Sequence, residues 1–286
     1  MPVNFHQQNL ITLTQYIDSN LTQPLTLSQL TKISGFSAYH LHRILSAHLG
    51  LPLNQYIQVK RLEKAAYQLS YRKHMTITDI AFDAGFSYVE SFSRAFKSYF
   101  GHSPRQYRQT NTKQPEITLP PRRIAMPIEQ EKFTVSIINL PDIQVATLRH
   151  IGDPNNVMTT VGKFIEWRRQ YHTPPSVSDT YNLLYADPDD VEPQDYQFDI
   201  CAQTDQPIEN QDYGVFTQKI AGGRYAMLKF TGPDSQLSYP LSYLYGTWLE
   251  QQGHELRDAP CVIKRIKMFP DVPHHLTEIE ILLPIN

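Results

Sequence analysis

The chain has 286 residues, of which 41% are hydrophobic and 19% charged, with a net charge of −2. This length suits two domains, and no apolar run approaches the roughly 20 residues that cross a bilayer. The N-terminus has no basic region before an apolar stretch, and the two cysteines match no metal or disulfide spacing. These features exclude a membrane protein and predict a chain without a signal peptide, folded in the cytoplasm.

The charge is distributed unevenly along the chain. Residues 1–113 carry 12 Lys and Arg against 5 Asp and Glu, a net of +7. Residues 114–286 carry 14 against 23, a net of −9. Such a basic front indicates either contact with a polyanion or solvated charges that segregated by chance.

The basic part repeats a pattern of helix, glycine turn and second helix. The repeats begin with TLSQLTKISG at Thr26 and TITDIAFDAG at Thr76. Each threonine is placed to cap a short helix, and Gly35 and Gly85 suit the left-handed turn that ends it. The pattern predicts two helix-turn-helix motifs, joined by one long helix in PLNQYIQVKRLEKAAYQLS. In such a motif the second helix enters the major groove of double-stranded DNA.

The second repeat continues as ITDIAFDAGFSYVESFSRAFKSYFGHSPRQYR and carries a specific signature. It resembles the DNA-binding domain of the AraC/XylS family of bacterial transcription regulators. The resemblance covers residues 8–109 and predicts an all-α DNA-binding domain over residues 1–110. It also implies RNA polymerase as a partner.

The resemblance implies an exposed reading face on the second helix of each motif. The base-reading candidates are Tyr39, His42, Arg43, Glu90, Ser91 and Arg94. Arg43 and Arg94 are expected to bond guanine, although phosphate contact or a solvated charge is the alternative for both. Glu90 either accepts a hydrogen bond from a cytosine amino group or closes a capping box with Ser87. The phosphate candidates are Lys60, Arg61, Lys97, Arg105 and Arg108.

Residues 111–130 are rich in proline and polar side chains and are predicted to form a linker. Beyond them, residues 131–286 carry a duplication that aligns Ala146 with Ala226 and Arg149 with Lys229. Each half reads strand, strand, helix, strand, strand. This order predicts an α+β domain with an antiparallel sheet and two packed helices.

The second domain resembles the GyrI-like effector-binding domain over residues 133–286. The segments that carry this resemblance are YADPDD, YQFDICA, AGGRYAMLKFTGP, LYGTWLEQQGHELRDAP and EIEILLPI. The family resemblance implies two pseudo-symmetric halves around a cleft for a bulky aromatic or cationic small molecule. It also places a glutamate four residues before a proline in that cleft, which is Glu280 here.

The residues themselves leave the role of Glu280 open. It shares one strand face with Glu278 and Leu282, and that face is either solvated or turned toward the cleft. A carboxylate in an apolar cleft would call for a cationic partner, which a ligand could supply. The aromatic candidates for the cleft, each of which could instead be core, are Tyr181, Tyr185, Phe164 and Trp248.

These observations predict a ligand-responsive regulator of transcription, acting as an activator, without a cofactor or a metal. Its partners would be double-stranded DNA, a small-molecule effector and RNA polymerase. One alternative is a GyrI-like hydrolase of electrophilic compounds that uses Glu280 with Tyr181 or Tyr185. Another is a C-terminal domain that binds a protein instead of a small molecule.

Overall fold

The computed structural model describes residues 5–110, 133–206, 208, 213–269 and 271–286. The predicted linker at 111–130 therefore lies outside the described residues. Contacts divide the chain into two units: Met1–Gly35 with Leu49–Ile128, and Phe36–His48 with Glu129–Asn286. In the described ranges no helix combines the length and the apolarity needed to span a membrane.

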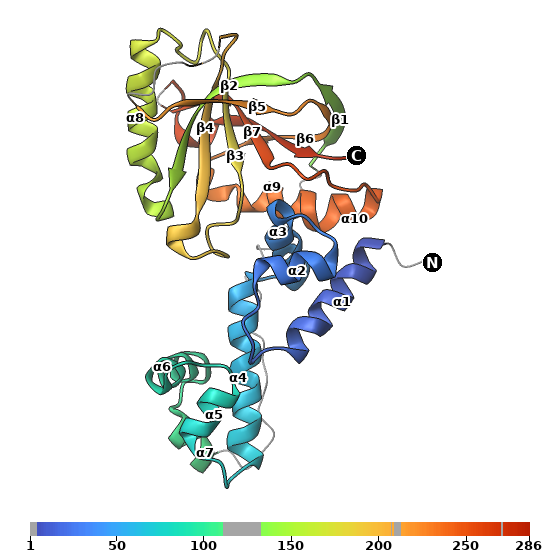
Figure 1. Cartoon of the computed structure of the whole chain (residues 1–286), viewed down its shortest axis with the longest axis vertical. Coiled ribbons are helices and arrows are strands. Elements are labelled where there is room, and N and C mark those ends of the chain that lie inside the picture. Colours follow the sequence, from blue (N-terminus) through green and yellow to red (C-terminus); the bar gives the residue numbers. More distant parts are fainter. Residues whose placement is uncertain (1–4, 111–132, 207, 209–212, 270) are drawn as a thin grey trace. The chain divides into compact units, whose positions relative to one another are not determined.

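The first unit is built from helices (Figure 1), and an apolar core lies among the last four of them. Its helices are α1 (Phe5–Ser19), α2 (Leu27–Ser34), α4 (Leu53–Tyr71), α5 (Ile77–Asp83), α6 (Val89–Phe100) and α7 (Pro104–Thr110). Leu62 and Leu69 of α4 and Phe92 and Phe96 of α6 are buried in this core. The long helix predicted between the two motifs is confirmed as α4.

The predicted helix caps are confirmed. The hydroxyl groups of Thr26 and Thr76 accept from the backbone three residues later, and the side chains of Gln29 and Asp79 bond back to each cap. Gly35 ends α2 with a φ of 70°. These bonds satisfy backbone donors that the first turn of a helix otherwise leaves free, so each cap fixes where its helix begins.

The second unit contains α3 (Ala38–Leu49) and an eight-stranded antiparallel sheet. The strands are β1 (Val135–Leu140), β2 (Ile143–Ile151), β3 (Thr180–Leu184), β4 (Gln197–Gln203), β5 (Phe216–Ile220), β6 (Gly223–Thr231), β7 (Cys261–Lys267) and β8 (Glu278–Pro284). The first half contributes α8 (Val157–Gln170). The second contributes α9 (Ser238–Tyr243), the π-helix η4 (Leu244–Trp248) and α10 (Leu249–Gln252).

The predicted duplication is confirmed, and the sheet order shows how the halves combine. The order is β1-β6-β8-β7-β3-β4-β2-β5, which reads the same from both edges when the halves are exchanged. Consecutive strands β1 and β2 do not pair with each other. β1 instead pairs with β6 of the second half, and β5 pairs with β2 of the first. Each half therefore supplies the edge strand of the other.

The two faces of the sheet carry different side chains. One face packs Ala146 and Ile200 against Phe164 and Trp167 of α8, which contacts β2 and β4 (Figure 1). Because side chains alternate along a strand, their neighbours lie on the opposite face. The apolar cluster there is Val145, Tyr181, Leu183, Cys201, Ile220, Tyr225, Val262 and Leu282. We call this second face the ligand face, because Tyr181, Tyr185 and Glu280, which are expected to bind a ligand, belong to it.

Candidate DNA-reading helices and ligand face

Helix α6 presents charged side chains to solvent. Glu90, Arg94 and Lys97 are exposed, and Ser91 is half-buried, while Phe92 on the other side is fully buried. This division follows from helical spacing, because residues three or four apart share a side. The exposed side of α6 therefore carries a cationic stripe of Arg94 and Lys97, with the carboxylate of Glu90 in the first turn.

The predicted capping box at this helix is wrong. The residue that caps α6 is Tyr88, whose side chain makes no capping bond, because the helix begins at Val89. Ser87 thus lies one position too early to satisfy the first turn. Glu90 therefore forms no capping box with Ser87. Its negative charge is favoured in the first turn, near the positive end of the helix dipole.

Of the five phosphate candidates, two bond to neighbouring protein groups, two are exposed and one is half-buried. Lys60 forms an ion pair with Glu63 at 3.0 Å, and the Nε of Arg61 donates to the carbonyl of Leu21 at 2.8 Å. Burial lowers the pKa of Arg61. Lys97 and Arg105 are exposed, whereas Arg108 is half-buried. Lys97 and Arg105 are thus the phosphate candidates whose side chains are fully accessible.

The expected exposure of the reading face on α3 is wrong for two of its three residues. His42 and Arg43 are 7% and 6% exposed, and Tyr39 is half-buried. The Nη2 of Arg43 donates to the carbonyl of Ala186 at 3.0 Å. No helical periodicity could have indicated this burial, because it arises from residues more than 140 positions away.

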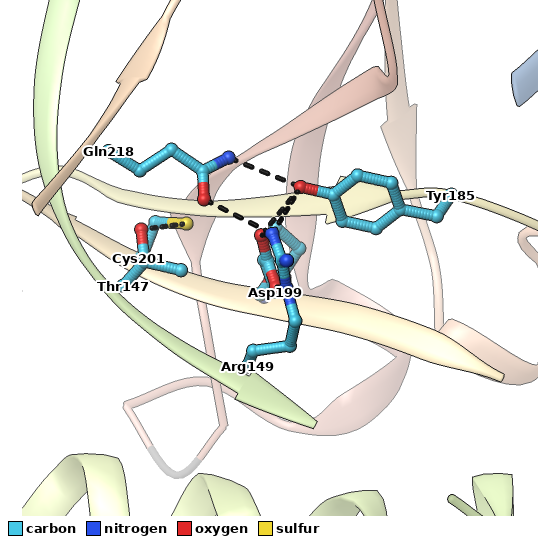
Figure 2. Close-up of polar contacts among 7 residues, drawn as sticks. Thr147, Arg149, Tyr185, Asp199, Cys201 and Gln218 are labelled. Atoms are coloured by element: carbon cyan, nitrogen blue, oxygen red, sulfur yellow. Dashed lines mark hydrogen bonds and ion pairs between the residues drawn. The ribbon is translucent and has the colours of Figure 1, made fainter. Parts of the chain in front are cut away.

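On the ligand face, Tyr185 contacts a polar cluster of Arg149, Asp199 and Gln218 (Figure 2). Tyr181 is buried on the same face. Asp199 is fully buried and accepts from the Nε and Nη2 of Arg149 at 2.7 and 2.8 Å. The hydroxyl of Tyr185 donates to Asp199 at 2.7 Å. The same hydroxyl accepts from Arg149 at 2.9 Å and from Gln218 at 3.2 Å.

This cluster holds its protons firmly. Hydrogen bonding to Asp199 raises the pKa of Arg149, while burial followed by the bond to Asp199 raises the pKa of Tyr185. Arg149 is therefore a fixed cation and Tyr185 a fixed donor across the neutral range. The side chain of Arg149 is 32% exposed. Because both groups keep their protons, the cluster suits the positioning of a ligand better than proton transfer.

Glu280 belongs to a second charge pair that repeats the first. β2 and β4 place Arg149 opposite Asp199, and β6 and β8 place Lys229 opposite Glu280. The Nζ of Lys229 lies 3.5 Å from Glu280, so the chain itself supplies the carboxylate with a cation. Asp199 is thus the counterpart of Glu280. Sequence reasoning missed it, although an acid followed by isoleucine in YQFDICA and EIEILLPI marks the match.

An open pocket of about 610 Å³ lies beside Lys229, within the size range of small-molecule sites. Its lining residues are Phe133, Thr134, Ser136, Met227, Lys229, Phe230 and Thr231. Glu280 is not in this lining and reaches it through Lys229. On the other side of Glu280, the ring of Tyr181 lies below the ammonium group of Lys264, 5.9 Å from the ring centroid.

Two of the aromatic candidates lie away from the ligand face. Phe164 stacks on Trp167 within the core under α8, at 5.3 Å between ring centroids. Trp248 belongs to η4, is 7% exposed and stacks on His254. The structure therefore brings together Tyr181, Tyr185 and Glu280 on one face and leaves Phe164 and Trp248 outside it.

Two family models match the chain, and together they cover both units. A model of the GyrI-like small molecule binding domain matches residues 133–286. A model of a helix-turn-helix domain matches residues 30–110.

Curated proteins show the same two-part similarity. The probable transcriptional regulator YgiV of Escherichia coli (strain K12) is 31% identical over 53% of this chain and 95% of its own length. The HTH-type transcriptional activator AarP of Providencia stuartii is 34% identical over 38% of this chain and 81% of its own. The transcriptional regulator Rob of Salmonella typhimurium (strain LT2) is 26% identical over 81% of both chains.

Proposed function

Because the chain belongs to the GyrI-like small-molecule-binding family and also carries a helix-turn-helix domain, we propose that it is a DNA-binding regulator of transcription controlled by a small molecule. The observation that carries the proposal is the exposed cationic stripe of α6, which follows the capped helix α5 and its glycine turn. Such a stripe matches the phosphates and base edges of a major groove.

The proposal includes activation through RNA polymerase and action in the cytoplasm, where a bacterial chromosome lies. A relative that spans the helix-turn-helix part is named as a transcriptional activator, which supports this direction of control. In vitro transcription from a template with the selected DNA site is the direct check. Increased transcript upon addition of the chain is expected, and a decrease would make it a repressor.

The DNA-binding part is tested by two neighbouring cations on α6. A duplex site is first selected from a random pool with the whole chain. Arg94→Ala is expected to lose about 1–3 kcal/mol of specific binding and to relax discrimination at one base pair. Lys97→Ala is expected to weaken binding to all DNA sequences alike. It should also reduce the slope of log affinity against log salt concentration by about 1.

The two variants control each other because both remove one exposed cation from the same helix. If Arg94→Ala keeps full discrimination while its salt slope falls, Arg94 contacts phosphate instead. If no sequence is enriched from the pool by the whole chain, the chain is not a sequence-specific DNA-binding protein.

The sensing part is proposed to use the ligand face around Glu280. This carboxylate is 20% exposed, and its ion-pair partner among the residues that the structure describes is the solvent-exposed Lys229. An aromatic cation could displace that lysine and pair with the carboxylate, while its rings contact Phe133, Met227 and Phe230 in the lining of the neighbouring pocket. A cationic aromatic effector is therefore the ligand class that this face suits.

Glu280→Gln tests this assignment because it keeps the shape and removes the charge. We expect an N-methylacridinium dye to bind the variant about tenfold more weakly, or about 1.4 kcal/mol, while its neutral parent acridine is unaffected. Glu278→Gln is the matched control, since Glu278 lies on the same strand as Glu280 and pairs with Lys267 of β7. Equal dye affinity for the wild type and both variants would return Glu280 to a merely solvated role.

A further inference from the structure

Helix α3 is expected to read DNA, yet its polar side chains are buried inside the second unit. His40 is fully buried, and His42 and Arg43 are nearly so. On α6, in contrast, Arg94 and Lys97 are exposed. A guanidinium that reads guanine must reach a base edge in the major groove, so Arg43 cannot do so where it lies.

The segment that follows β3 covers one side of α3. Besides the bond from Arg43 to the carbonyl of Ala186, the hydroxyl of Ser46 donates to the Oδ2 of Asp190 at 2.9 Å. His42 lies 3.9 Å from the same carboxylate oxygen, which is itself buried. The ring of Tyr39 packs 5.7 Å from the ring of Tyr185. We call residues 185–190 the cover segment.

The π-helix η4 holds another side of α3. The Nε2 of His40 lies 3.0 Å from the carbonyl of Arg257, and its Nδ1 lies 2.9 Å from the hydroxyl of Tyr245. Because a carbonyl only accepts, Nε2 carries the proton and Nδ1 accepts from Tyr245. Gly246 allows close approach: a Cβ at this position would lie 3.0 Å from the Cβ of Ala47. Single-turn π-helices are frequent at functional sites.

The packing of α3 is incomplete in a way that favours release. The Nε and Nη1 of Arg43 are buried without a hydrogen-bond partner among the described residues, and so is the Nδ1 of His42. A buried guanidinium that bonds only a neutral carbonyl is poorly compensated for the water it has lost. Phosphates and guanine would satisfy the same groups better. The docked helix is therefore held by close packing and by the hydrogen bonds of His40 and Ser46, and is opposed by its own arginine.

We propose that the cover segment and η4 form an internal docking surface for α3, and that docking of α3 and reading of DNA by α3 exclude each other. This inference rests on the proposed function and assigns its regulation. Tyr185 connects the two sites, because its ring contacts Tyr39 while its hydroxyl belongs to the Arg149–Asp199 cluster. A ligand that moves Tyr185 changes the docked population of α3 and hence the affinity for DNA.

Gly246→Leu tests the proposal without altering α3. The added side chain points at Ala47 and opposes docking, and its backbone conformation is one that leucine adopts freely. Gly162→Leu on α8 is the matched control, because nothing lies within 4 Å of a Cβ there. In fluorescence anisotropy of the whole chain with its selected DNA site, we expect Gly246→Leu to bind about tenfold more tightly than wild type and Gly162→Leu to bind equally.

A reversible cross-link gives the opposite perturbation. Ala47→Cys combined with Gly246→Cys should form a disulfide that locks α3 in the docked state. The oxidised protein should lose footprint protection over one major groove, and dithiothreitol should restore it. Unchanged affinity of Gly246→Leu, or an unchanged footprint of the cross-linked protein, would overturn the docking proposal while leaving DNA binding intact. Absence of sequence-specific binding by the wild type would overturn the proposed function and this inference with it.

Discussion

At the scale of single residues, the two charge pairs of the ligand face differ in what surrounds them. Asp199 is fully buried and its oxygens receive donors from two residues, Arg149 and Tyr185. Glu280 keeps contact with solvent, and its partner Lys229 is 73% exposed. The same register therefore holds a structural pair in one half and an adaptable pair in the other.

This difference predicts that truncating Asp199 lowers the free energy of unfolding more than truncating Glu280. Asp199→Ala leaves Arg149 without its partner and is expected to lower the free energy of unfolding by about 3–5 kcal/mol. Glu280→Ala removes a screened pair and is expected to lower it by at most about 1 kcal/mol. Urea unfolding followed by tryptophan fluorescence measures both, because the two tryptophans of the chain, Trp167 and Trp248, lie in the second unit. Equal losses would mean that the pairs are equivalent.

At the scale of elements, boundaries set by local chemistry are the ones that the sequence predicts. The threonine caps of α2 and α5 and the glycine end of α2 depend on neighbouring residues, and all are confirmed. At α5 the residue that ends the helix is Ala84, and Gly85 makes the left-handed turn one residue later. The missing cap at Ser87 shows the limit of such reasoning. A capping pattern was present there, but the helix began one residue later.

Two of the glycine turns make a matched pair for testing this local chemistry. Gly85 and Gly101 both have positive φ, of 86° and 74°. A Cβ at Gly85 would lie 2.8 Å from the carbonyl of Leu21, whereas a Cβ at Gly101 meets nothing within 4 Å. Gly101→Ala is expected to lower stability by about 1–2 kcal/mol, for the left-handed backbone alone. Gly85→Ala should lower it clearly more in thermal unfolding followed by circular dichroism, and similar losses would show that Leu21 moves aside.

At the scale of the whole molecule, some features could not be predicted from the sequence. Each of them depends on contacts between residues that are far apart in the chain. Periodicity identified the eight strands and the duplication. It could not show that β1 and β5 exchange between halves, or that His42 and Arg43 are covered by residues 185–190. Alternation along a strand predicted that Tyr181 and Tyr185 share a face, whereas Glu280 was singled out by the family resemblance. Asp199 and Gln218 were missed because pairing across strands decides their role.

The burial of α3 makes the stability of the whole chain sensitive to pH. Burial, together with the nearby charge of Arg43, lowers the pKa of His40 to about 4. A histidine that is neutral when docked and protonated when released contributes full stability above its ordinary pKa, about 6.5. That contribution falls by up to about 1.4 kcal/mol per pH unit as the pH drops toward 4.

Urea unfolding of the whole chain at pH 7.0 and 5.5 is expected to show this loss. His40→Gln, which keeps a donor and an acceptor but does not titrate, should reduce the dependence on pH. A variant with the wild-type dependence would assign the effect to other groups, such as His42, whose pKa burial also lowers.

The exchange of edge strands has a consequence for the origin of the sheet. β1 finds its partner only in β6, and β5 only in β2, so neither half closes its own edge. An ancestral gene that encoded one half could have completed this sheet only as a symmetric homodimer, in which each copy lent its first strand to the other. After fusion of the two copies, the halves could diverge. The acidic side chain of the first half, Asp199, is buried, and that of the second half, Glu280, is partly accessible. Paired identical binding surfaces became a single asymmetric one.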